Sequence, residues 1–387
     1  MQSSLLYWAR FLICLYTGMM PPLLPVFMDK LGLSVVMAGF LISAFSMCTS
    51  FSQPVFGWIG DRVGYAYFVC LSPLATGIAI GSVGLCSSFA GMVAALSIAG
   101  LSIAAFHPAA FAYTASYPLC ARPKALSHLL LYGSFGFVGG PLAASAFTDY
   151  AGLDAIWLFV VPGALMTGLL LRKTCSLSSA RGKTAAESGL RSNSSIASIL
   201  PLFSLASCIT IITMSLYTFT PILLSAQGCS LLVVGAMISA FAFGCALGPF
   251  SGVWLAKKSS ELKAVIASAV LSIVLLLCFI HTDAMVPKGI LFFFLGLSLM
   301  LPYAIFMHLG QKRIPERPGL ASSLLGGGAW GLGGLALIGV GKAAEAFGTE
   351  NVLELLIILV IFTMPVIFWC EHRGIFTEQR SKATEVN

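Results

Sequence analysis

The chain has 387 residues, of which 58% are hydrophobic and only 9% charged, and its mean hydropathy is +0.96. A water-soluble protein of this length could not bury so much apolar surface, so the composition excludes a soluble globule and predicts an integral membrane protein in a lipid bilayer. In such a protein the net charge of +7 reports membrane orientation and does not imply a nucleic-acid partner.

Long apolar runs of roughly 18–25 residues predict membrane-spanning helices in chain order. Six lie at 5–28, 35–57, 67–86, 89–112, 125–147 and 154–171. Six more lie at 199–226, 231–255, 262–281, 289–310, 319–341 and 351–369. The stretch between the two sets is rich in Ser, Arg, Lys and Gly, which is typical of a flexible linker.

These runs predict an all-α fold with four consecutive parts. They are an N-terminal six-helix bundle at 1–171, a linker at 172–198, a C-terminal six-helix bundle at 199–372 and a tail at 373–387. If both termini are cytosolic, all of the 21 Lys and Arg residues fall on the cytosolic side except Lys30, Lys288 and Lys342. This asymmetry obeys the positive-inside rule, and it predicts that both termini and the linker are cytosolic.

The two sets of helices repeat one another. Ile42-Ser43-Ala44-Phe45 reappears as Ile238-Ser239-Ala240-Phe241, and Gly100-Leu101-Ser102 reappears as Gly296-Leu297-Ser298, both at an offset of 196 residues. A nearly constant offset over such a distance indicates a duplicated six-helix unit. The predicted bundles are therefore pseudo-symmetric halves in parallel orientation.

A charged segment, Gly57-Trp58-Ile59-Gly60-Asp61-Arg62-Val63-Gly64, lies between the second and third spans and predicts a tight turn with charges at the membrane surface. It resembles the loop signature of the major facilitator superfamily, which joins the second and third of twelve helices. The sequence departs from that signature after Gly64, where Tyr65 replaces a basic residue. The alternative is a plain loop whose charges only stop membrane transfer.

The resemblance implies that this segment helps to hold the two bundles closed on the cytosolic side. Its candidate gating residues are Gly57, Gly60, Asp61, Arg62 and Gly64. The second copy carries Ala256 where the first carries Asp61, so only the first copy supplies a carboxylate.

The fifth span contains Gly136, Gly140 and Pro141, which resemble the superfamily's antiporter-type motif Gly-x-x-x-Gly-Pro. Two glycines four residues apart share one helix face and permit close helix contact, while Pro141 removes a backbone hydrogen bond. Simple helix packing is the alternative interpretation, and physical chemistry alone favours it.

The fourth span contains Phe106-His107-Pro108, and the duplication places Pro302-Tyr303 at the matching position of the tenth span. Proline-interrupted helices at matching places indicate a binding region. His107 can change charge near neutral pH, so it is a candidate for substrate or proton binding. The alternative is a neutral histidine that is hydrogen-bonded within its bundle.

Together with Leu23-Leu24-Pro25 and the glycines from Gly319 to Gly334, Phe106-His107-Pro108 resembles the fosmidomycin-resistance branch of the superfamily. That resemblance implies a proton-coupled antiporter in the cell membrane that exports drugs or other small organic solutes by alternating access. The branch usually follows His-Pro with Glu and soon Arg, whereas here Ala109 and Ala110 follow, and an acidic position in its first helix corresponds to Gly18.

No Asp or Glu lies at the middle of any predicted span, so proton coupling has to rest on His107, His308 or carboxylates near the outer face, or be absent. Arg10, in the first span, is a candidate to bind an anionic substrate. The more common alternative is that its side chain reaches back to the membrane surface as a topology anchor.

Helices 1, 7 and 10 line the pore in this superfamily and helix 11 borders it, which implies that several aromatic residues face the cavity. These candidates are Tyr16, Tyr217, Tyr303 and Trp330. Each has interhelical packing as its alternative role.

The motifs of intramembrane enzymes are missing from this sequence, including HExxH, Gly-x-Ser-x-Gly and an acid pair near a histidine. The eleven cysteines show no ligand spacing, so we predict neither a metal site nor a cofactor. The expected protein is a monomeric transporter of a small molecule and not an enzyme. The alternatives are a proton- or solute-coupled importer and, more remotely, a receptor that transports nothing.

Overall fold

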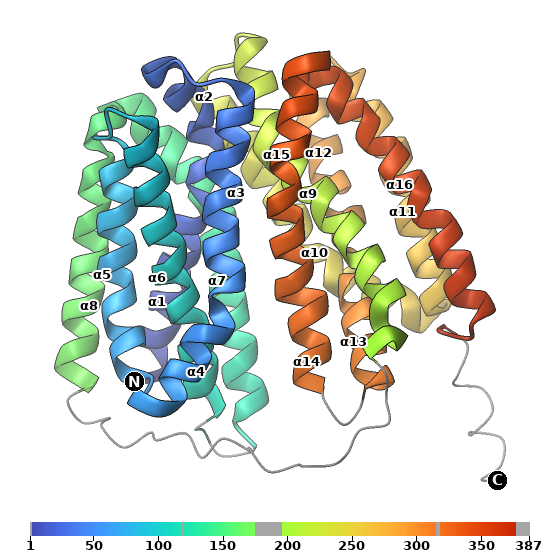
Figure 1. Cartoon of the computed structure of the whole chain (residues 1–387), viewed down its shortest axis with the longest axis horizontal. Helices are drawn as coiled ribbons and strands as arrows, with labels where there is room; N and C mark the ends of the chain where they lie inside the picture. The colour runs from blue at the N-terminus through green and yellow to red at the C-terminus, as the bar shows by residue number, and fades with distance from the viewer. Residues whose placement is uncertain (1, 116, 118–119, 175–195, 315–317, 377–387) are drawn as a thin grey trace. The chain divides into compact units, whose positions relative to one another are not determined.

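The computed structural model describes residues 2–115, 117, 120–174, 196–314 and 318–376, and within these ranges all regular structure is helical (Figure 1). Twelve helices of the described part are long and apolar enough to cross a membrane. They are Ser4–Leu31, Val35–Val63, Ala66–Val83, Phe89–Thr114, Lys124–Ala151, Leu153–Arg172, Ala197–Ala226, Leu231–Lys258, Glu261–Ile280, Met285–Arg313, Gly319–Phe347 and Thr349–His372. The all-α fold with twelve spans is confirmed, while most of the linker and the tail lie outside the described residues.

In the first and the tenth span, proline removes a backbone donor where the helix breaks, and a side chain from another helix takes its place. The first span divides into α1 (Gln2–Gly18) and α2 (Met20–Leu31), because Pro22 has no N–H to bond the carbonyl of Gly18 four residues earlier. The tenth divides into α12 (Met285–Met300) and α13 (Tyr303–Arg313), because Pro302 leaves the carbonyl of Ser298 without its helical donor. The Ser268 hydroxyl donates to that Ser298 carbonyl at 2.7 Å, so the break is satisfied within the protein.

The fourth span behaves differently, since α6 (Phe89–Ala115) runs through Pro108 without a break. The predicted pair of matching interruptions is therefore found in the tenth span only.

The segment from Gly57 to Gly64 is not the turn that the sequence suggested. The second span divides into α3 (Val35–Phe51) and α4 (Gln53–Val63), and α4 carries the segment as a helix up to Val63. Only Gly64 and Tyr65 separate α4 from α5 (Ala66–Val83), and Gly64 has φ +93°, a conformation that favours glycine. The expected turn is shorter because Gly57 and Gly60 stay helical and leave the change of direction to Gly64.

The remaining helices follow without strands among the described residues. They are α7 (Arg122–Ala151), η1 (Leu153–Phe159), α8 (Val160–Thr174), η2 (Ile196–Ile199), α9 (Leu200–Ala226), α10 (Leu231–Lys258), α11 (Glu261–Ile280), α14 (Pro318–Ser323), η3 (Leu324–Gly328), α15 (Ala329–Phe347) and α16 (Thr349–His372). Among them η3 is a π-helix inside the eleventh span.

The chain forms two compact units whose limits cross the predicted bundles. Unit 1 consists of Met1–Glu187, Tyr217–Ser239 and Gly334–Thr349, and unit 2 of Ser188–Leu216, Ala240–Gly333 and Glu350–Asn387. Within unit 1, parts of α9, α10 and α15 approach the first six spans so closely that a Cβ on Gly39 would lie 2.8 Å from the Leu337 carbonyl. Unit 2 contains the stacked rings of Phe241, Phe292 and Phe279, with centroids 4.3 and 4.6 Å apart.

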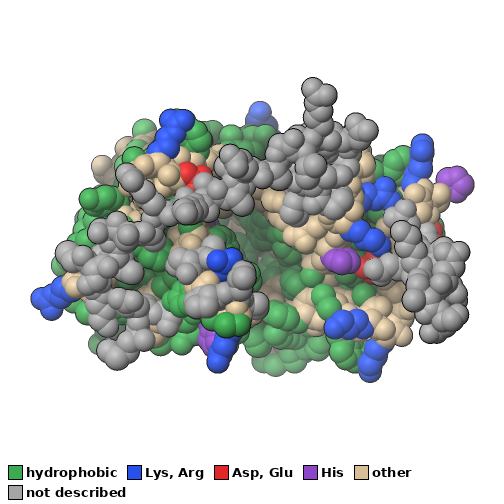
Figure 2. All heavy atoms as spheres, turned by 90° about the horizontal axis from the view of Figure 1, so that it is seen from below, with side chains coloured by type: hydrophobic (Ala, Val, Ile, Leu, Met, Phe, Trp, Pro, Cys, Tyr) green, Lys and Arg blue, Asp and Glu red, His purple; other side chains and the backbone are tan. Residues whose placement is uncertain are grey.

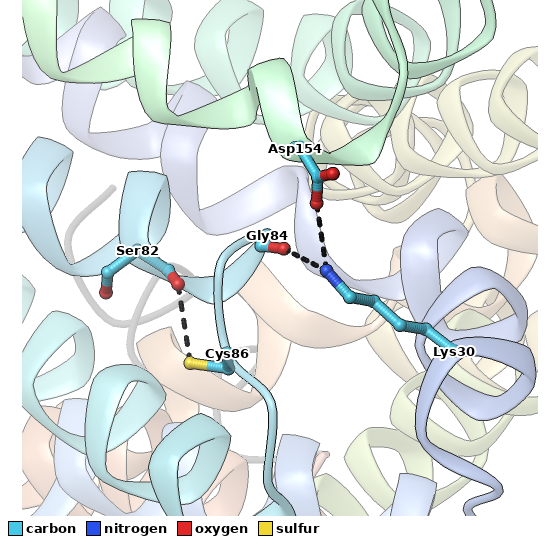
Figure 3. A network of polar contacts seen from close by, with 5 residues as sticks. All are labelled: Lys30, Ser82, Gly84, Cys86 and Asp154. Carbon is cyan, nitrogen blue, oxygen red and sulfur yellow. Dashed lines mark hydrogen bonds and ion pairs between the residues drawn. The ribbon is translucent and has the colours of Figure 1, made fainter.

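At one end of unit 1, a lysine ties three segments together (Figure 3). Lys30 at the end of α2 donates to the Gly84 carbonyl after α5 at 2.5 Å and pairs with Asp154 of η1 at 2.9 Å. This is the one ion pair among the described residues. Asp154 is 79% exposed, so its charge is largely screened and the pair stabilises the fold by about 1 kcal/mol or less.

Basic side chains gather where even-numbered spans end and odd-numbered spans begin. Those among the described residues include Arg62, Arg122, Lys124, Lys257, Lys258, Lys312, Arg313 and Arg373. The view from below shows blue basic side chains with few red acidic ones on the visible surface (Figure 2). We predict that this face is cytosolic.

Labelling of single cysteines on a cysteine-free background checks this orientation. Ser259 and Asp283 are both exposed and lie at opposite ends of the ninth span. A membrane-impermeant maleimide should label Asp283→Cys in sealed right-side-out vesicles and Ser259→Cys only after permeabilisation. The opposite pattern would reverse the topology.

Candidate functional site

Asp61 at the end of α4 is held by a tyrosine from the following turn. The Tyr65 hydroxyl donates to Asp61 Oδ1 and lies 3.2 Å from the Gly57 carbonyl oxygen. Burial, the hydrogen bond to Asp61 and the negative charge of Asp61 together raise the pKa of Tyr65 to about 12. The phenol therefore keeps its proton throughout the physiological range and stays a donor to the carboxylate.

Arg62 and Gly60 of the same segment also have neighbours close by in the chain. Arg62 does not pair with Asp61; its guanidinium lies over the Trp58 ring, 3.6 Å from the centroid. Gly60 leaves room for the Tyr65 ring, since a Cβ there would overlap that ring. Gly60 thus permits the contact between Tyr65 and Asp61, which leaves Asp61 as an exposed negative charge in a defined position.

Arg10 and His107 meet inside unit 1. Arg10 Nη1 contacts His107 Nδ1, and the same Nη1 lies 3.4 Å from His107 Nε2. Both residues are half-buried, and they bring α1 and α6 together across 97 positions of the sequence. Because a guanidinium only donates, the contacted imidazole nitrogen must be the unprotonated one, so this arrangement holds His107 in its neutral form.

The walls around Arg10 are apolar. Its guanidinium carbon lies 5.7 Å from the centroid of the Phe111 ring. Gly133 of α7 makes room for the side chain, because a Cβ there would lie 2.8 Å from Arg10 Nε and 3.3 Å from Cys14 Sγ. Arg10 Nε is buried and has no hydrogen-bond partner among the described residues.

The glycines of the fifth span pack α7 directly on the backbone of α1. A Cβ on Gly136 would overlap the Phe11 carbonyl, and one on Gly140 would overlap the Leu15 carbonyl and lie 2.9 Å from the Gly18 Cα. Gly18 meets the same seam from α1. Gly136 and Gly140 therefore have a packing role in the structure, whatever else they do.

Tyr217 of α9 contacts the break in the first span. Its hydroxyl donates to the Gly18 carbonyl at 3.4 Å, and its ring stacks on Phe137 with centroids 5.3 Å apart. The freed carbonyl of a broken membrane helix is the kind of group that binds ligands or needs a protein donor. Here Tyr217, beside Gly18 and Pro141, supplies the donor.

Two other candidates from the sequence point into the helix packing. Tyr16 is fully buried, and its hydroxyl donates to the Phe159 carbonyl at 2.6 Å. Phe106 is also fully buried, next to His107. These positions favour the packing alternative for both side chains.

The candidates of unit 2 form a second group. Tyr303 of α13 and Trp330 of α15 have neighbouring side chains, and both are half-buried. Gly326 of the π-helix η3 lies beside them, since a Cβ there would be 3.4 Å from the Tyr303 hydroxyl. His308 of α13 is exposed and takes no part in this group.

Sequence reasoning missed three contributors. Tyr65 appeared only as a departure from a signature, and neither Gly133 nor the π-helix at Leu324–Gly328 was singled out. The three consecutive glycines at 326–328 were the available signal, because glycine permits irregular backbone conformations. π-Helical turns are frequent at functional sites. The described residues hold no cluster of His, Cys, Asp or Glu that could bind a metal, and their cysteines are free thiols.

Comparison with known proteins agrees with this architecture. Residues 6–338 match the Major Facilitator Superfamily. The fosmidomycin resistance protein of Escherichia coli (strain K12) is 24% identical over 358 residues, which cover 90% of this chain and 87% of that protein. The quinolone resistance protein NorA of Staphylococcus aureus is 26% identical over 141 residues, 36% of either chain.

Among solved structures, a bacterial homolog to the human lysosomal transporter Spinster in an inward-facing and occupied conformation is similar with a TM-score of 0.81. The two chains share 14% identity over 97% of each, so the similarity is one of fold. A mutant of the nucleoside transporter NupG is similar with a TM-score of 0.72 at 13% identity, covering 97% of this chain and 100% of that one.

Proposed function

Because the chain belongs to the Major Facilitator Superfamily and is a multi-pass membrane transporter, not an enzyme, we propose that it is a proton-coupled exporter of a small organic solute. The exported solute would cross by alternating access, in which two conformations expose the binding site to either side in turn. Resistance to a drug in the names of two relatives supports export over import.

The contact between Arg10 and His107 carries the coupling proposal. Every Asp and Glu in the membrane spans lies near a span end, so His107 is a rare titratable group at depth in unit 1. A proton on its contacted nitrogen would break the bond to Arg10 and place two positive charges side by side. Proton binding at His107 and release of Arg10 would therefore be one event, which is how a proton can control a binding site.

His107→Gln tests this coupling. Glutamine keeps an acceptor for Arg10 but cannot titrate, so the dependence of transport on pH should flatten on the acid side of neutrality, because the neighbouring guanidinium opposes a second positive charge on His107. Transport is measured as initial solute flux in proteoliposomes with an imposed pH gradient, using a drug panel as solutes.

His128→Gln is the matched control, because His128 is half-buried like His107 but lies near the beginning of α7, where its Nδ1 contacts the Lys124 carbonyl at 2.7 Å. That variant should keep the wild-type pH profile. A wild-type profile in His107→Gln would leave His107 as a packing residue, and a flattened profile in His308→Gln would move the proton site to α13.

A further inference from the structure

The positive charge of Arg10 is fixed well inside its span. Arg10 lies about 12 Å along α1 from its beginning, and His107 about 12 Å along α6 from its end, at the rise of an α-helix. A side chain that reached back to the membrane surface would leave His107, yet Nη1 stays on the imidazole and the guanidinium lies beside Phe111. The geometry therefore disfavours the role of a surface anchor for Arg10.

No protein carboxylate in the described part of the chain neutralises this charge. The one ion pair there joins Lys30 to Asp154 at the end of unit 1, and the neighbours of Arg10 are an imidazole, a phenyl ring and a glycine. Uncompensated charges at membrane depth are costly and mark pathways for substrates and ions. Arg10 and its neighbours thus form a positive site without a counter-ion among these residues.

Arg10 also has unused donors. A guanidinium offers five N–H groups in a planar fork, of which the contact to His107 uses one. Its Nε is buried without a partner among the described residues. The fork matches the two oxygens of a carboxylate or phosphonate, which accept parallel hydrogen bonds from Arg.

We propose that Arg10 and His107 form the binding site for the oxyanion headgroup of an amphipathic organic anion, a carboxylate or a phosphonate whose apolar body lies against Phe111. This assignment rests on the proposed transport function and adds the charge class of the substrate. The headgroup supplies the missing counter-ion, and His107 can donate to the same oxygens once it is protonated.

Binding to the purified full-length protein in phosphatidylcholine nanodiscs tests the proposal by calorimetry. The probes are benzoate and phenylphosphonate, with benzamide as a neutral molecule of the same shape. Both anions should bind at least tenfold more tightly than benzamide. Equal binding of benzamide, or no binding of either anion, would overturn the proposal.

Variants assign the binding to Arg10. Arg10→Gln should weaken anion binding at least tenfold. Arg10→Lys keeps the charge but loses the fork, so its anion affinity should lie between those of the wild type and Arg10→Gln. Lys342→Gln is the matched loss of a basic side chain, since Lys342 is exposed in α15 of unit 1, and should bind like the wild type. Size-exclusion chromatography confirms that each variant is folded. Unchanged anion affinity in folded Arg10→Gln would contradict the assignment.

Two further arms separate the possible explanations. A phospholipid headgroup has the same oxyanion chemistry, so the titration is repeated in phosphatidylglycerol nanodiscs. The probe affinity there should stay within threefold of its value in phosphatidylcholine. A loss of probe binding would assign the site to lipid and overturn the solute site. Flux in proteoliposomes is scored independently. Arg10-dependent binding without any flux would support the anion site and refute the export function. Flux of neutral solutes without anion binding would support the export function and refute the anion site.

Discussion

Gly136→Ala should destabilise the protein by about 3 kcal/mol or more, whereas Gly139→Ala should leave it unchanged or stabilise it by up to about 1 kcal/mol. The two glycines lie three residues apart inside α7 and differ in their surroundings. A Cβ on Gly136 would overlap the Phe11 carbonyl of α1, which is backbone and cannot rotate away, while a Cβ on Gly139 has nothing within 4 Å. Melting temperatures of the purified variants in one detergent measure the difference.

The comparison also separates the two interpretations of the fifth span. If Gly136 and Gly140 only pack α7 on α1, transport per folded molecule in Gly136→Ala should equal that of the wild type while the amount of folded protein falls. If Gly136→Ala melted at the same temperature as Gly139→Ala, α1 and α7 would not approach each other as closely as they do in the structure.

Asp61→Asn should lower the transport rate by up to about fivefold with little loss of folded protein. Asparagine keeps an oxygen that accepts from the Tyr65 hydroxyl, so the local hydrogen bond survives and only the negative charge is removed. Asp61 is exposed, and its loss should cost about 1 kcal/mol or less in stability. A change of that size between two nearly balanced conformations shifts their ratio about fivefold, which is enough to impair a gate.

Tyr65→Phe is the matched variant, because it keeps the charge of Asp61 and removes the hydroxyl that positions it. We expect its transport rate to lie between those of the wild type and Asp61→Asn. Rates are initial fluxes in proteoliposomes, divided by the amount of incorporated protein. A wild-type rate in Asp61→Asn would refute the gating role, and a Tyr65→Phe rate below that of Asp61→Asn would make the tyrosine the essential group.

The sequence by itself determined the number and approximate limits of the spans. An apolar run long enough to cross a bilayer has to satisfy its backbone internally as a helix, so length and composition decide the element before any tertiary contact forms. The twelve predicted runs overlap the twelve observed spans for this reason. The family could also be predicted from the sequence, since the segment from Gly57 to Gly64 and the stretch around His107 carry local signatures.

Where helices break was less predictable. Proline at 22 and at 302 interrupts its span while proline at 108 does not, although all three lack the same N–H. At the breaks beside Pro22 and Pro302, a side chain from another helix donates to the freed carbonyl. The partners of the broken spans, Tyr217 and the Ser268 hydroxyl, come from other helices and cannot be inferred from the local sequence.

Only the tertiary structure decided which polar side chains meet. Arg10 and His107 are separated by 97 positions and lie together because the close seam of α1 and α7 and the space at Gly133 direct the guanidinium toward α6. Tyr16 and Phe106 were equally plausible site residues from the sequence, but their side chains are buried in the packing between helices. In an apolar chain every helix face looks alike to sequence analysis, because lipid and protein interior are both apolar; the face that receives a charged group is set by packing between helices.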